Sequence, residues 1–127
     1  MHSSDFPKIF DTLKAILRPY EESPAVERDQ PGDYSLNTHF IGPNKKPLFF
    51  GAVTIRKNYV SFHLMPVYVF PVLLEGVSPE LKKRMQGKSC FNFRKLDEDI
   101  LTELAQLTQK GYERFRSKEI IEKFLSI

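Results

Sequence analysis

The chain has 127 residues, 41% of them hydrophobic and 28% charged, which is the size and composition of one globular domain and not of a disordered segment. Its 19 basic and 16 acidic residues leave a formal net charge of +3, an excess that permits an anionic partner but does not predict nucleic acid. The single cysteine, Cys90, excludes an intrachain disulfide and a zinc site of several thiolates, and it fits a reducing cytosol.

Export and membrane insertion are not indicated. The first residues lack a basic start followed by an apolar core, so no signal peptide is predicted. The longest apolar run, Val67 to Leu74, is far shorter than the about 20 residues of a membrane-spanning helix. We therefore expect a soluble, cytoplasmic protein that makes no membrane contact.

Residues 6–20 show the period of an amphipathic helix. Apolar side chains recur at helical spacing, at Phe6, Ile9, Phe10, Leu13, Ile16, Leu17 and Tyr20. Ser4 or Asp5 is the predicted cap, and Pro7 falls in the first turn, where its missing N–H costs nothing. The polar segment 21–32, which holds two prolines and a glycine, is predicted to be a loop.

A period of two begins at Tyr34 and predicts three consecutive strands, at about 34–40, 48–56 and 59–65. The segment Lys57-Asn58 is expected to form a tight hairpin between the last two, which pairs Ala52 with His63. One face is then the core face, with Phe49, Val53, Ile55, Val60, Phe62 and Leu64. The opposite face is mixed, with Phe50, Ala52, Thr54, Arg56, Tyr59, Ser61, His63 and Met65.

Two further elements are predicted before the last helix. Segment 67–74 is too apolar to be an exposed loop. Ser78 is the expected cap of a short helix that runs through Met85, and Gly87 ends that helix. Residues 89–94 follow as a fourth strand, with alternate side chains inward.

The last helix begins after Asp97, its predicted cap, and Gly111 bends or interrupts it. A final amphipathic turn or two is expected near residues 120–125. The predicted fold is therefore α+β: a single domain over residues 1–127, with an antiparallel sheet of about four strands flanked by N-terminal and C-terminal helices.

Two segments carry a resemblance to a known family. They are Ser78-Pro79-Glu80-Leu81-Lys82-Lys83 and Gly87-Lys88-Ser89-Cys90-Phe91-Asn92-Phe93. These segments and the order of the predicted helices and strands carry the resemblance. Over roughly residues 6–115, the chain resembles the YdhG-like bacterial domains, domain-of-unknown-function family 1801. The resemblance implies an α+β fold whose members mostly have no assigned activity.

One branch of that family is described as a frataxin-like intracellular iron chaperone, which makes iron handling an alternative function. Frataxin-type iron binding uses a carboxylate-rich ridge on the first helix. Here the first helix carries Asp5 and Asp11 between basic residues, whereas hard cations need several converging oxygen ligands.

The mixed sheet face is the candidate binding site, because an apolar floor with a few converging polar groups is typical of a small-molecule pocket. The candidate residues lie on or beside this face: Tyr59, Ser61, His63, Arg56, Lys88, Cys90 and Asn92. The alternative is that a helix packs over the face and pairs these groups inside the core.

Cys90 beside His63 would have the makings of an activated nucleophile. The alternative is a buried cysteine that packs as a small hydrophobic group. His39 and His63 could share a metal, but two imidazoles without a nearby carboxylate make a weak site, and half-buried histidines are the simpler interpretation.

The densest basic cluster, Lys82, Lys83, Arg84 and Lys88, could form a patch for phosphate or RNA together with Arg94 and Lys95. An exposed aromatic residue such as Tyr59 could then stack on bases. The alternative is a solvated helix face whose field is cancelled by nearby acidic residues.

We therefore predict a non-enzymatic binding or interaction domain that needs no cofactor and no metal. The expected partner is a small molecule or a second copy of the chain, and nucleic acid is not expected. The alternatives are a frataxin-like iron-handling protein and an enzyme that uses Cys90 with His63.

Overall fold

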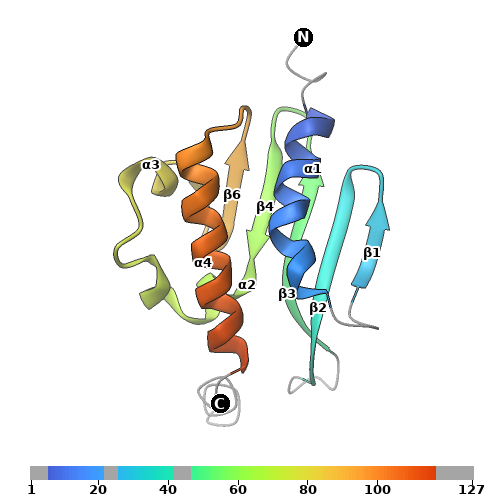
Figure 1. Cartoon of the computed structure of the whole chain (residues 1–127), viewed down its shortest axis with the longest axis vertical. Coiled ribbons are helices and arrows are strands. Elements are labelled where there is room, and N and C mark those ends of the chain that lie inside the picture. The colour runs from blue at the N-terminus through green and yellow to red at the C-terminus, as the bar shows by residue number, and fades with distance from the viewer. Residues whose placement is uncertain (1–5, 22–25, 42–46, 117–127) are drawn as a thin grey trace.

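The structure, a computed structural model, describes residues 6–21, 26–41 and 47–116. Within these ranges the chain forms two layers, an antiparallel sheet and a layer of helices on one of its faces (Figure 1). The sheet has six strands in the order β1-β2-β3-β4-β6-β5. The predicted α+β class with an antiparallel sheet is thus confirmed, with two strands more than expected.

The strands are β1 (Val26–Gln30), β2 (Asp33–Ile41), β3 (Pro47–Ile55), β4 (Val60–Leu64), β5 (Met85–Gln86) and β6 (Cys90–Phe93). The helices are α1 (Phe6–Leu17), α2 (Met65–Val69), α3 (Pro79–Lys82) and α4 (Glu98–Arg116), with the 3-10 turns η2 (Arg18–Tyr20) and η3 (Pro71–Leu74). Of these helices, which lie in the described ranges, none is long and apolar enough to cross a membrane.

Both additional strands lie at the edges of the sheet. β1 occupies part of the segment predicted as a loop, because Gly32, with φ of 74°, lets the chain reverse and pair Gln30 with Asp33. β5 replaces the last residues of the predicted short helix, which ends at Lys82. An edge strand needs no alternation of apolar and polar residues, so the sequence pattern did not predict β1 or β5.

The central hairpin has the predicted register. Ala52 pairs with His63 and Val53 pairs with Phe62. Val60, Phe62 and Leu64 are fully buried under α1 and α4, while Ser61 and His63 are half-buried on the opposite face. The alternation of β4 is therefore the one expected from the sequence.

The prediction for Phe49 and Phe50 was wrong, because β3 contains a bulge. The pairing with β2 shifts between Leu36, opposite Gly51, and Asn37, opposite Phe49. The extra residue reverses the alternation at this point. Phe50 is consequently buried at 1% exposure against the helices, while the Phe49 ring contacts His63 on the other face.

The predicted caps inside the described ranges are confirmed. The Asp97 side chain accepts hydrogen bonds from the N–H groups of Asp99 and Ile100, at 3.0 and 3.3 Å. The Ser78 hydroxyl accepts one from Leu81 N–H at 3.2 Å. The predicted cap at Ser4 or Asp5 and the last turn near residues 120–125 lie outside the described residues.

Gly111 does not interrupt α4, contrary to the prediction, since the helix runs from Glu98 to Arg116. A Cβ atom at Gly111 would lie 2.8 Å from the Cβ atom of Pro66 in α2. The glycine therefore permits the close approach of two elements.

Candidate ligand-binding site

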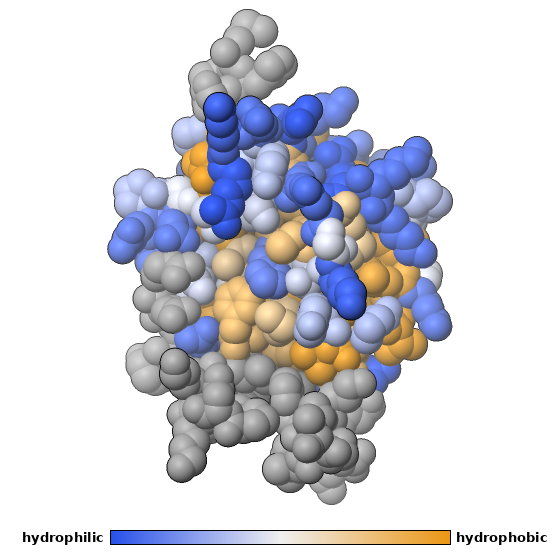
Figure 2. Space-filling view, turned by 180° about the vertical axis from the view of Figure 1, so that it is seen from behind, coloured by the Kyte–Doolittle hydropathy of each residue, from blue (hydrophilic) through white to orange (hydrophobic). Residues whose placement is uncertain are grey.

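The face of the sheet opposite α1 and α4, here called the outer face, is open. None of the described helices lies over it (Figure 1). In Figure 2, which shows the molecule from this side, apolar residues cross the middle and hydrophilic residues gather towards the end that holds the β3–β4 turn. The described part of the chain therefore does not place a helix over the mixed face.

Strand pairing brings four of the predicted site residues together on the outer face. His63 of β4 lies opposite Cys90 of β6, and Ser61 lies opposite Asn92. The prediction that these side chains share a face is confirmed, because β6 neighbours β4. Whether they bind a ligand remains a prediction.

His63 and Cys90 are neighbours on adjacent strands. Within the described residues, no hydrogen bond joins their side chains. The imidazole instead packs against the Phe49 ring, with 4.9 Å between the ring centroids. Burial lowers the pKa of His63, so that the neutral imidazole is favoured.

A large open hollow lies at the end of the sheet where β3 turns into β4. It has a volume of about 1040 Å³. The residues around it come from the start of α1, the β3–β4 turn, the segment after α3, and β6 with the residues that follow it: Phe6, Lys57, Asn58, Tyr59, Lys83, Arg84, Met85, Gln86, Asn92, Arg94 and Lys95. Five of these described residues are basic and none is acidic.

Hydrogen bonds join three of the lining residues, Arg84, Gln86 and Asn92. The Arg84 carbonyl accepts a hydrogen bond from Asn92 N–H at 2.7 Å, and the Asn92 amide donates to Gln86 Oε1 at 2.7 Å. The Arg84 guanidinium lies 5.2 Å from the centroid of the Phe93 ring, a cation–π distance. Its buried Nε has no hydrogen-bond partner among the described residues.

The hollow includes only part of the predicted site. Tyr59 and Asn92 line it. Ser61 pairs with Asn92 on the adjoining sheet face. The pair of His63 with Cys90 is the next one on the same face, further from the hollow. Arg56 and Lys88 are exposed side chains that are not among the lining residues.

The basic residues of the hollow were only partly recognisable in the sequence. Lys83, Arg84, Arg94 and Lys95 belonged to the predicted basic cluster, and Tyr59 was the aromatic residue considered beside it. Lys57 was interpreted only as a turn residue. None of the described lining residues carries a carboxylate.

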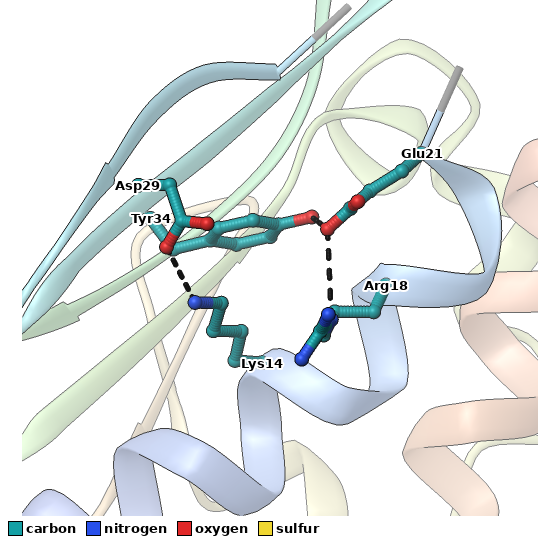
Figure 3. Close-up of polar contacts among 5 residues, drawn as sticks. All are labelled: Lys14, Arg18, Glu21, Asp29 and Tyr34. Carbon is teal, nitrogen blue, oxygen red and sulfur yellow. Dashed lines mark hydrogen bonds and ion pairs between the residues drawn. The ribbon is translucent and has the colours of Figure 1, made fainter. Parts of the chain in front are cut away.

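A second polar cluster lies on the helix side of β2 and has a structural role (Figure 3). The Tyr34 hydroxyl donates to Glu21 Oε1 at 2.7 Å, and Lys14 forms an ion pair with Asp29. Arg18 lies 3.7 Å from the same Glu21 oxygen. These contacts link the β1–β2 hairpin to α1 and to the turn that follows it.

A metal centre gains no support from the described residues. Among them no group of three or more histidine, cysteine, aspartate or glutamate side chains is placed to hold an ion. The side chain of His39, which was considered as a second metal ligand beside His63, lies outside the described side chains.

No family model, curated protein or solved structure matches this chain.

Proposed function

We propose that this protein is a non-enzymatic binding domain that takes a phosphate-bearing ligand in the hollow at the end of the sheet. The observation that carries the proposal is the grouping of five basic residues around one hollow, with no carboxylate among its described lining residues. The predicted binding function is retained, and its proposed site moves from His63 towards Tyr59 and Asn92.

The chemistry of the lining suits a phosphate. Arg84 and Arg94 present guanidinium groups, which bind oxyanions through two parallel N–H donors. The side-chain amides of Asn58, Gln86 and Asn92 add neutral polar groups. Tyr59 contributes apolar surface, so that the hollow combines a partly apolar wall with convergent polar groups.

The proposal is tested by titrating the protein with inorganic tripolyphosphate at constant ionic strength. A ligand that binds only the folded state raises its melting temperature. We expect such a rise for the unmodified protein and a several-fold weaker affinity for Arg94→Gln. Lys88→Gln removes an exposed charge outside the hollow and should bind as the unmodified protein does.

The proposal fails if millimolar tripolyphosphate gives no more stabilisation than sodium sulfate at equal ionic strength. It also fails if Arg94→Gln and Lys88→Gln weaken binding equally, because the effect would then reflect net charge alone.

The pairing of Cys90 with His63 keeps an enzymatic function as a second candidate. A neutral imidazole next to a thiol can accept its proton. This function requires thiolate at neutral pH, so alkylation of Cys90 by iodoacetamide should be nearly independent of pH between about 6 and 8. Alkylation that occurs only after denaturation would end this alternative. Loss of phosphate binding would not bear on it.

The resemblance to YdhG-like domains likewise stays a proposal, and with it the iron-handling alternative. That alternative predicts that iron(II) raises the melting temperature through linkage. No shift up to millimolar iron(II) would remove it.

A further inference from the structure

From the form of the hollow we infer that its ligand is a single-stranded nucleic acid, with phosphates at the basic hollow and bases against the adjoining outer face. This inference rests on the proposed function and specifies its ligand. It differs from the expectation drawn from net charge. Four of the five cations belong to the basic patch that the sequence offered as an alternative, and the structure adds Lys57 next to Tyr59.

The cations come from three separate segments. Lys57 lies in the β3–β4 turn, Lys83 and Arg84 follow α3, and Arg94 and Lys95 follow β6. These three segments border one open hollow with five cations. The cations match a chain of phosphates, each of which meets its own cation.

The size and openness of the hollow also favour a chain over a single nucleotide. Its volume of about 1040 Å³ lies at the upper end of the range for clefts that enclose a small molecule, about 300–1,000 Å³, and the hollow is open to solvent. Asn92 lines the hollow and also lies on the outer face, opposite Ser61. The hollow therefore continues onto the open sheet.

The adjoining surfaces carry ring systems. Tyr59 lines the hollow and is half-buried, and the half-buried rings of Phe49 and His63 lie in contact on the outer face. Unpaired bases stack on aromatic side chains of open antiparallel sheets in proteins that bind single strands. A duplex keeps its bases inside and would leave these rings unused.

The test is fluorescence anisotropy with a labelled oligouridylate of about ten nucleotides, within the range that such surfaces occupy. Affinity is measured in NaCl from about 50 to 200 mM. If all five cations contact phosphates, log K falls with log salt at a slope of about −3.5, since each contact on a single strand contributes about −0.7.

Matched variants assign the contacts. Lys83→Gln and Lys95→Gln should each reduce the magnitude of the slope by about 0.7. Lys82→Gln is the control, because Lys82 precedes Lys83, is equally classed as exposed and does not line the hollow. It should leave the slope unchanged. Equal effects of Lys82→Gln and Lys83→Gln would overturn the placement of the phosphates at the hollow.

Tyr59 tests the stacking. Tyr59→Ala should weaken binding by roughly 5- to 100-fold and Tyr59→Phe should retain it, because the ring faces and not the hydroxyl contact the bases. Melting curves confirm that both variants are folded. If Tyr59→Ala fails to fold, Tyr59→Leu replaces it. Full affinity in a folded variant without the ring would contradict base stacking.

The remaining outcomes separate this inference from the proposed function. Binding of tripolyphosphate without binding of the oligouridylate overturns the inference and leaves the proposed function intact. Equal affinity for uridine monophosphate or for a duplex also overturns it. Absence of binding to both tripolyphosphate and the oligouridylate overturns both proposals.

Discussion

Tyr34 shows how one side chain joins the two layers. Its ring is fully buried on the helix side of β2, and the Lys14 ammonium lies 5.0 Å from the ring centroid. Its hydroxyl donates to the Glu21 carboxylate at 2.7 Å. Burial and this carboxylate raise the pKa of Tyr34, so the hydroxyl remains a donor throughout the ordinary pH range.

Tyr34→Phe should lower the free energy of unfolding by about 1–2 kcal/mol, because the Glu21 carboxylate loses a hydrogen-bond donor in a partly buried position. Urea denaturation measures the change. The control is Tyr68→Phe at a residue that is 55% exposed, where a change within about 0.5 kcal/mol is expected. Equal effects would show that the Tyr34 hydroxyl contributes nothing specific.

His63 predicts a dependence of stability on pH. Burial lowers its pKa from 6.5, so just below that pH the unfolded chain binds more protons than the folded protein does. Stability therefore falls as pH drops through the unfolded pKa. His63→Gln should lose less stability than the unmodified protein between about pH 7.5 and 5.5. An identical pH profile for the two proteins would contradict the assignment.

At the scale of elements, the bulge in β3 decides which of two adjacent rings enters the core. The sequence Phe49-Phe50-Gly51 fits either alternation, and the regular period of two favours the wrong one. Phe50 instead contacts Tyr20, Tyr112 and Phe115, with ring centroids 5.7, 5.7 and 6.1 Å away. Packing against α4, which is distant in the sequence, selects the bulged arrangement.

The two phenylalanines provide a matched pair of variants. Phe50→Ala should lower the free energy of unfolding by about 3–5 kcal/mol, as expected for removing a fully buried ring. Phe49→Ala should cost less than half as much, since Phe49 is only half-buried. Chemical denaturation measures both losses. A larger loss for Phe49→Ala than for Phe50→Ala would show that Phe49, and not Phe50, lies on the core face.

The whole molecule is a sheet with helices on one side, and its stability should be graded across the sheet. β4 is paired on both sides and fully buried at Phe62, whereas β1 is paired with β2 alone. Native-state hydrogen exchange should show β4 amides exchanging only by global unfolding and β1 amides by local opening. Equal protection of the two strands would contradict this order.

Features that depend on near neighbours were predictable from the amino-acid sequence. The fold class, the β3–β4 register and the caps at Ser78 and Asp97 follow from periodicity, a two-residue turn and contacts within three residues. The sequence left open whether β6 neighbours β4, and that pairing places Ser61, His63, Cys90 and Asn92 on one face.

The edge strands, the bulge and the hollow depend on contacts between distant parts of the chain and were not predictable from the sequence. β1 and β5 pair at sheet edges without an apolar pattern, and Gly111 is required by its contact with Pro66. The hollow unites Phe6, Lys57 and Lys95, which are far apart in the chain. Such positions depend on long-range packing, because local periodicity specifies which way a side chain faces and not which distant residue it meets.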